Sequence, residues 1–359
     1  MTATTDTAQG NKARIAVVGV GLGGKTHINR LHISEVAVLD AIVAPKREYN
    51  CMVAKNEGVP IFHSIDECIS QRKPDGIIIA TPNQVHAGHT RICIEAGVPA
   101  LLEKPVTATL EEGSQLVEQV ENSQTPILVG HHRAHNPIIR IAGKLVREGR
   151  LGKLTTVMGS AQFLKPSHYF DDGPWRKEPG GGPVLINLIH EIDNLRRLAG
   201  EIAQVQAITS NHIRGFSVED TAVINIVFDN GALGSFMLSD AAATARSWEQ
   251  TSGENPNFPS YPDEDCYLIA GTRGSLAIPT LRLKYYPEGV DPSWWTPFTE
   301  ETFSVVQQDP IALQITHFVD VIRGKATPLV TVRDGYRNLL IAEAIRRSAA
   351  TRTVVNVSG

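Results

Sequence analysis

The chain has 359 residues, of which 42% are hydrophobic and 20% are charged, and its net charge at pH 7 is −4. This length predicts two domains, and the negative charge argues against a dedicated nucleic-acid-binding protein. No apolar run approaches the roughly 20 residues that span a bilayer, and the four cysteines have neither zinc-binding nor disulfide-framework spacing. We therefore expect a cytoplasmic protein with reduced thiols, without a membrane partner or a metal site.

The first third of the chain alternates between short apolar runs and helix-like stretches. Residues 1–12 are small and polar and predict a disordered tail, and the alternation begins at residue 13. Strand–helix alternation with continuously apolar strands predicts a doubly wound parallel sheet of the Rossmann type over residues 13–135. The expected strands are 14–18, 38–43, 76–80, 98–102 and 126–129. The expected helices are 24–31, 48–56, 65–70, 84–96 and 110–122.

Residues 136–359 predict a second, α+β domain with a large open, mostly antiparallel sheet. The expected strands are 154–163, 205–212, 221–228, 232–239 and 267–270, with a hairpin turn at Asp229-Asn230-Gly231. The expected helices are 137–149, 183–198, 310–323 and 333–350. For the last of these helices, packing against the first domain is an alternative to packing within the second. The loop-like segments 240–265 and 288–301 are either lids or oligomer contacts.

The first expected strand runs into the sequence GVGLGG, residues 19–24, which has the spacing G-x-G-x-x-G and opens a helix. This is the context in which the motif binds a dinucleotide. Gly19 permits the tight turn, Gly21 lets a pyrophosphate approach the backbone, and Gly24 lets the helix pack closely on the strand. Leu22 and Gly23 lie at the helix N-terminus, whose unpaired N–H groups attract phosphate. The motif predicts an NAD(P) site.

The end of the second strand indicates which form of the cofactor is bound. An NAD-binding domain places a carboxylate there to hold the ribose hydroxyls. Ala44 occupies this position, and Lys46 and Arg47 follow at once. Without a repelling carboxylate, the two cations favour the 2′-phosphate of NADP. The alternative is that Lys46 and Arg47 merely form a solvated helix start.

Two residues are candidates for proton transfer. Lys104 follows an apolar strand, at the sheet edge where ligands bind in open α/β sheets. A lysine is a poor base at neutral pH unless burial or a neighbouring positive charge lowers its pKa. His190 lies on the expected helix 183–198 behind three glycines, and Asn187 shares its face. The alternative for His190 is a histidine buried in the core.

Six segments together resemble the Gfo/Idh/MocA family of oxidoreductases over nearly the whole chain. They are GVGLGG, ATPNQVH (residues 80–86), LLEKP (101–105), GHHRAHNP (130–137), GGGPVLINLIHEID (180–193) and GTRGSL (271–276). The resemblance implies that Lys104 is the catalytic or substrate-orienting cation and that His190 contacts or deprotonates the reacting hydroxyl. It also implies cofactor contacts along the ribose and nicotinamide from Thr81, Pro82, Asn83, His86 and Glu103.

The resemblance also implies a set of substrate contacts. These are Asn187, Arg133, Trp175 and Arg176, the last two matching a pair found in sugar-acting relatives, with a rim salt bridge as the alternative for Arg176. His132 and His135 depart from the family pattern, which has an amide and an aromatic residue there, and they either line the substrate cleft or have a structural role. Many members carry an aspartate four residues before the histidine, where this chain has Ile186. An amide at Asn187 cannot replace that carboxylate as a base, so more of the mechanism falls to Lys104 and His190.

The implied function is an NAD(P)-dependent dehydrogenase or reductase acting on a small-molecule substrate, namely a cyclic polyol, a sugar or a related ring compound. Three alternatives stay open: a cis-dihydrodiol dehydrogenase, a non-catalytic NAD(P)-binding regulator, and a glycosidase that oxidises its substrate transiently. The resemblance further implies a homodimer or homotetramer formed through the sheet of the second domain.

Overall fold

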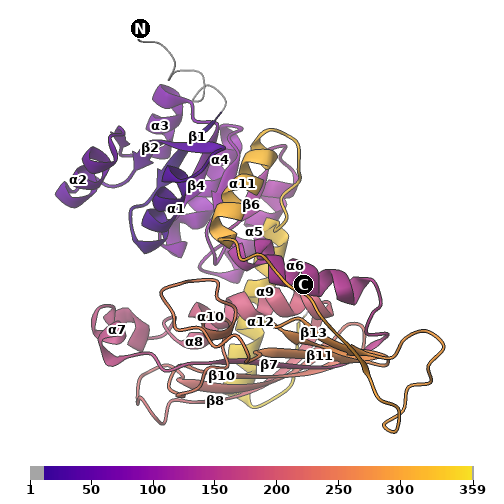
Figure 1. Ribbon diagram of the computed structural model, residues 1–359. Helices are drawn as coiled ribbons and strands as arrows, with labels where there is room; N and C mark the ends of the chain where they lie inside the picture. Colours follow the sequence, from indigo (N-terminus) through magenta and orange to yellow (C-terminus); the bar gives the residue numbers. More distant parts are fainter. Residues whose placement is uncertain (1–11, 358–359) are drawn as a thin grey trace. The chain divides into compact units, whose positions relative to one another are not determined.

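The computed structural model describes residues 12–357 (Figure 1). The predicted tail, apart from Lys12, lies outside this range. Contacts within the chain divide it into two units. Unit 1 is the chain up to His132 together with Pro310–Leu339, and unit 2 is Arg133–Asp309 together with the chain from Leu340 onward.

The sheet of unit 1 has six parallel strands in the order β3-β2-β1-β4-β5-β6. The strands are β1 (Ala13–Val18), β2 (Ala37–Val43), β3 (Ile61–Phe62), β4 (Gly76–Ile79), β5 (Ala100–Leu102) and β6 (Ile127–Val129). The parallel Rossmann sheet is therefore confirmed. The sequence interpretation missed β3, because two residues are too few to show a pattern.

Helices surround this sheet, and most begin where the sequence predicts. They are α1 (Leu22–His32), α2 (Glu48–Glu57), α3 (Ile65–Arg72), α4 (His86–Glu95) after a 3₁₀ turn at Asn83–Val85, α5 (Leu110–Glu121) and α11 (Pro310–Ile322). The side chains of Ser64 and Thr109 cap α3 and α5 by accepting backbone N–H groups. Helix α11 packs so closely on β4 that a Cβ on Gly76 would lie 2.6 Å from the Ile322 side chain.

The sheet of unit 2 has nine strands in the order β14-β13-β12-β11-β7-β10-β9-β8-β15. All neighbours are antiparallel except β7 and β10, which confirms the mostly antiparallel sheet. The strands are β7 (Leu154–Gln162), β8 (Ile202–Ser210), β9 (Thr221–Phe228), β10 (Leu233–Ser239), β11 (Tyr267–Gly271), β12 (Gly274–Ile278), β13 (Arg282–Tyr285), β14 (Thr299–Thr302) and β15 (Val355–Asn356). Gly231, with φ +85°, closes the predicted turn between β9 and β10.

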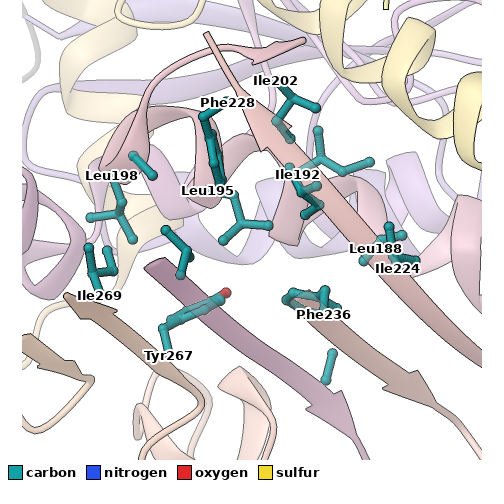
Figure 2. Close-up of a cluster of buried hydrophobic side chains, with 14 of the residues drawn as sticks. Leu188, Ile192, Leu195, Leu198, Ile202, Ile224, Phe228, Phe236, Tyr267 and Ile269 are labelled. Carbon is teal, nitrogen blue, oxygen red and sulfur yellow. The ribbon is translucent and has the colours of Figure 1, made fainter. Parts of the chain in front are cut away.

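Helices cover one face of this sheet and bury its core. They are α6 (Pro137–Arg147), α7 (Ser167–Asp171), α8 (Pro183–Ile186), α9 (Leu188–Ala199), α10 (Trp248–Thr251) and the last part of α12 (Val332–Thr351). Short 3₁₀ turns lie at His132–His135 and Pro174–Lys177. Figure 2 shows side chains of α9, including Leu188, Ile192 and Leu195, packed with Phe236 and Tyr267 of the sheet.

Two expectations for unit 2 were wrong in detail. The single helix expected over residues 183–198 is interrupted at Asn187, which ends α8 and begins α9. The segment expected to be a loop over residues 240–265 contains α10, and the one over 288–301 runs into β14. No helix within residues 12–357 is long and apolar enough to cross a membrane.

The opposite face of the nine-stranded sheet carries exposed apolar side chains. Met158, Ile208 and Leu233 are 59%, 72% and 59% exposed. The strand register places Met158 beside Leu268, Met237 beside Val223, and Val223 beside Ile208. We call Met158, Ile208, Val223, Leu233, Met237 and Leu268 the open face.

Candidate active site

The glycine turn has the geometry that a dinucleotide requires. Gly19 has φ +97°, and a Cβ on it would lie 2.6 Å from the carbonyl oxygen of Ala80. A Cβ on Gly24 would lie 1.9 Å from the carbonyl oxygen of Gly19, so α1 can pack this closely only with glycine there. Nothing lies within 4 Å of the corresponding position on Gly21, which leaves space for a phosphate beside the helix N-terminus. Leu22 and Gly23 form the first turn of α1.

The end of β2 has no carboxylate available for a ribose. Ala44 is buried, while Lys46 and Arg47 are exposed just before α2. The nearest acid in the strand, Asp40, is buried and engaged by Arg72, with 3.2 Å between Arg72 Nε and Asp40 Oδ2. Lys46 and Arg47 are therefore exposed cations at this position, and the exposed Glu48 that follows them begins α2.

A hydrogen bond that sequence reasoning missed connects the dinucleotide helix to the segment containing Lys104. His27 of α1 is buried, and its Nε2 lies 2.7 Å from Glu103 Oε1. The backbone N–H of Lys104 donates to the other carboxylate oxygen at 3.2 Å. Burial alone would raise the pKa of Glu103, but the His27 hydrogen bond and the charges of His27, Lys104 and His132 outweigh it and lower the pKa to about 2. Glu103 is therefore ionised at any working pH.

His86 holds the Ala80–His86 segment in place through both nitrogens of its ring. Nδ1 lies 2.8 Å from the carbonyl oxygen of Pro105, and Nε2 lies 2.8 Å from that of Thr81. Burial lowers the pKa of His86, against these two carbonyls, which favour the protonated ring. The His86 side chain thus joins the two segments within unit 1. Between Thr81 and His86, Pro82 precedes the short 3₁₀ turn that begins at Asn83. The direct cofactor contact that the resemblance implies for His86 gains no support from this arrangement.

Arg133 lies in a buried charge network of unit 2. Its guanidinium donates to Glu191 and, at 2.8 Å, to Glu249, and its Nε lies 4.0 Å from Glu254. The hydroxyl of Tyr267 donates to the other oxygen of Glu191. Burial, only partly offset by the Arg133 charge, raises the pKa of Glu191 to about 7. Because three carboxylates already surround the guanidinium, we assign Arg133 a structural role.

Glycines make room for the start of α8, the short helix just before the helix α9 that carries His190. A Cβ on Gly181 would lie 2.3 Å from the carbonyl oxygen of Trp175, and one on Gly182 would lie 2.3 Å from the Glu219 carboxylate. That carboxylate accepts the backbone N–H of Val184 at 2.9 Å, at the start of α8. One turn further on, the backbone N–H of His190 donates to the carbonyl of Asn187 at 3.1 Å. His190 and Asn187 are both half-buried.

A second residue that sequence reasoning missed is Lys165, which follows β7. Its Nζ lies 2.7 Å from Asn187 Oδ1 and 3.7 Å from Asp240 Oδ2, and its side chain is 11% exposed. The ammonium also lies 4.9 Å from the centre of the Tyr169 ring. Burial lowers the pKa of Lys165 to about 8, against the opposing charge of Asp240. No local sequence pattern indicates this residue, because its partner Asn187 lies 22 positions away.

The other predicted substrate contacts, Trp175, Arg176, His132 and His135, have different surroundings. Trp175 is 57% exposed, and the guanidinium of Arg176 lies 3.9 Å from the centre of the Tyr169 ring while donating to the Tyr169 carbonyl. His132 is half-buried in unit 1, and its charge contributes to the low pKa of Glu103. His135 is buried in unit 2. Across residues 12–357, no three His, Cys, Asp or Glu side chains are grouped so that they could hold a metal ion.

A parallel sheet with this glycine turn, followed by a nine-stranded α/β unit, defines the class of NAD(P)-dependent oxidoreductases. Residues 13–131 match the model "Oxidoreductase family, NAD-binding Rossmann fold", and residues 143–357 match "Oxidoreductase family, C-terminal alpha/beta domain". The chain belongs to the Gfo/Idh/MocA family, as its motifs indicated.

Curated relatives and solved structures agree with this assignment. The chain is 25% identical over 337 residues to the rhizopine catabolism protein MocA of Rhizobium meliloti, covering 92% of this chain and 93% of the relative. It is 26% identical over 361 residues to scyllo-inositol 2-dehydrogenase (NAD(+)) of Bacillus subtilis, covering 94% of each. A levoglucosan dehydrogenase solved with NADH and levoglucosan shares the fold, with a TM-score of 0.78, 21% identity and coverage of 97% and 100%.

Proposed function

We propose that this oxidoreductase transfers a hydride between a nicotinamide cofactor and a ring-borne hydroxyl or carbonyl of a cyclic polyol, a sugar or a related compound. The observation that carries the proposal is the contact between His27 and Glu103, at 2.7 Å. It ties the segment that carries Lys104 to the helix that begins at the glycine turn. A lysine held at the carboxyl end of β5, beside a dinucleotide turn, is placed for the chemistry of a bound nicotinamide.

In this proposal the protein supplies proton transfer and orientation, while the cofactor accepts or delivers the hydride. Lys104 takes the proton of the reacting hydroxyl, and His190 binds that hydroxyl and holds it in position. Because position 186 is an isoleucine and not a carboxylate, proton transfer and orientation of the hydroxyl fall to Lys104 and His190 alone. Asn187, Trp175 and Arg176 are proposed to bind the remainder of the substrate.

The proposal extends to the cofactor and to assembly. NADP is the proposed cofactor, because Ala44 leaves the end of β2 without a carboxylate and Lys46 and Arg47 lie exposed beside it. A homodimer or homotetramer is proposed to form through the open face, because apolar patches of this kind are rare on monomers.

The experiment that tests the reaction is a substrate panel. The purified protein is incubated with NADP+ or NAD+ and with sugars, inositols and dihydrodiols, and the absorbance of the reduced nicotinamide is followed. Oxidation of a sugar or inositol supports the proposal, and oxidation of dihydrodiols alone redirects it to aromatic diols. Tight cofactor binding without reduction by any member would indicate a regulator. Glycoside cleavage without net reduction would indicate transient oxidation.

A variant of the proposed base sharpens this test. We expect Lys104→Ala to lower turnover by about 10²- to 10⁴-fold while leaving cofactor affinity nearly intact, since general acid–base groups contribute this much. The matched control is Lys144→Ala, which removes an exposed lysine of α6 whose ion pair with Glu148 is 3.6 Å long. Turnover that survives Lys104→Ala at the level of the control would remove Lys104 from the mechanism.

A further inference from the structure

The contact between Lys165 and Asn187 determines the orientation of the asparagine amide. A lysine ammonium has three donors and no acceptor, so the atom it meets at 2.7 Å must be the amide oxygen. The Asn187 nitrogen is then turned away from Lys165, and its two N–H groups are presented as donors. Lys165 therefore makes a hydrogen-bond donor of a residue that could otherwise have presented either end of its amide.

Lys165 shares its nearest carboxylate, Asp240, with a second cation, Arg214. Asp240 has its oxygen Oδ1 2.6 Å from Arg214 Nε, and its other oxygen lies 3.7 Å from Lys165 Nζ. Arg214 also donates to the backbone carbonyl of Lys165 at 2.9 Å. One carboxylate thus serves two cations, and the tighter pair is the one with Arg214. Lys165 Nζ, with three N–H donors, holds its share of this carboxylate at the longer distance of 3.7 Å.

From this geometry we propose that Lys165 and Asn187 form a subsite for a substrate carboxylate, so that the natural substrate is a sugar acid or another ring compound bearing an acidic group. This inference rests on the proposed function and specifies its substrate class. The ammonium supplies the charge, and the amide N–H groups supply direction. The aromatic rings of Phe163 and Tyr169, at 5.4 and 4.9 Å, stabilise the ammonium when no ligand is bound.

The titration of Lys165 is consistent with such a subsite. Burial lowers its pKa to about 8, the charges of Asp240 and Glu249 oppose this, and the charge of Arg214 adds to it. A bound carboxylate would favour the protonated lysine and raise this pKa again. Affinity for an acidic ligand should therefore fall as the pH rises above about 8, whereas affinity for a neutral ligand should not.

The test compares matched probes on matched variants. The probes are D-glucuronate and D-galacturonate, each with its parent hexose, which differs only in carrying a hydroxymethyl group in place of the carboxylate. The variants are Lys165→Met, Lys165→Arg and the control Lys153→Met, which removes an exposed lysine just before β7. Binding is measured by calorimetry with saturating NADP+ present, and cofactor affinity is measured separately, so that binding is decided even where no probe is oxidised.

We expect the wild type to bind at least one acid more tightly than its parent hexose. Lys165→Met should weaken acid binding by about 10- to 100-fold, as expected for a charge-assisted hydrogen bond, and should weaken hexose binding much less, because only the orientation of Asn187 is then lost. Lys165→Arg should restore part of the loss, and Lys153→Met should change nothing. The inference is overturned if no acid binds the wild type, if hexoses bind better, or if Lys165→Met weakens both probes equally. Hexose oxidation without acid preference would overturn this inference and leave the proposed function standing.

Discussion

His27 and Glu103 lie 76 positions apart in the chain, yet their side chains meet at 2.7 Å between Nε2 and Oε1. The carboxylate also accepts the backbone N–H of Lys104. The helix that begins at the glycine turn and the lysine segment are therefore joined within unit 1 through the Glu103 carboxylate.

The low pKa of Glu103 should appear in the pH dependence of stability. Its pKa is lowered to about 2, so its contribution is fully present above the ordinary value of 4.5 and is lost as the pH falls toward 2. We expect the free energy of unfolding of the wild type to exceed that of Glu103→Gln at pH 6, and the difference to shrink between pH 4.5 and pH 3. Urea unfolding at each pH measures it, and a difference that grows on acidification would contradict the assignment.

Gly21 and Gly24, the second and third glycines of the G-x-G-x-x-G motif, should behave differently when each is changed to alanine. Gly24→Ala places a Cβ 1.9 Å from the carbonyl oxygen of Gly19, so we expect a loss of several degrees in melting temperature as well as lost cofactor binding. Gly21→Ala meets nothing within 4 Å and should keep the wild-type melting temperature while weakening cofactor binding. Melting curves and reduced-cofactor fluorescence separate the two effects. Equal melting temperatures would show that α1 can move away from β1.

Removal of the cations after β2 should change cofactor preference. In a Lys46→Ala, Arg47→Ala double variant we expect the affinity for NADP+ to fall by about 10- to 100-fold and that for NAD+ to stay within about twofold, since charge-assisted contacts to the 2′-phosphate are lost. Titration of both cofactors on both proteins measures this. If the variant loses affinity for both cofactors alike, these side chains do not read the 2′-phosphate.

Glu191 should make the protein less stable as the pH rises from about 4.5 toward neutrality. Its pKa is raised from 4.5 to about 7 in the folded protein, so between these values the folded state holds a proton that the unfolded state has lost. The free energy of unfolding should therefore fall from pH 5 to pH 7, and this slope should be weaker in Glu191→Gln. If Glu191→Gln leaves the pH dependence of the free energy of unfolding unchanged, another group is responsible for that dependence.

Arg133→Met is expected to lower the free energy of unfolding by about 3–5 kcal/mol, because it leaves buried carboxylates without their cation.

Charges placed on the open face should disrupt assembly. Met158→Lys and Met237→Lys put an ammonium on the exposed side of β7 and β10, where apolar side chains are 59% and 38% exposed. We expect light scattering to report a smaller particle for each variant, with unfolding behaviour unchanged. The control is Ile33→Lys, a 71% exposed position in unit 1 that should leave the particle size as it is. A wild type that is already monomeric would refute the proposed assembly.

Much of the fold could be predicted because buried parallel strands are continuously apolar, as β1, β2 and β4 are. The edge strand β14 and its neighbour β13 could not, since β14 is mostly exposed and β13 carries exposed polar residues such as Arg282 and Lys284. Periodicity reports which face of an element is buried. It says nothing of a strand that has little buried surface.

The candidate site was harder to predict, because its residues are defined by partners distant in sequence. Gly19, Gly21 and Gly24 were found from their spacing, since the backbone itself imposes it. His27 and Lys165 were not found, because their partners Glu103 and Asn187 lie 76 and 22 positions away and no local pattern links them. For Arg133, the motif position predicted a substrate contact but gave no sign of the buried carboxylates that the guanidinium meets.

The division of the chain into units has a consequence for any attempt to take the protein apart. Each unit is assembled from two stretches of sequence, and the last crossing, between Leu339 and Leu340, falls inside the continuous helix α12. A ribosome therefore completes the cofactor-binding unit only after it has made most of the partner unit. No single cut releases either half intact, so a nonsense mutation near residue 309 removes the end of both.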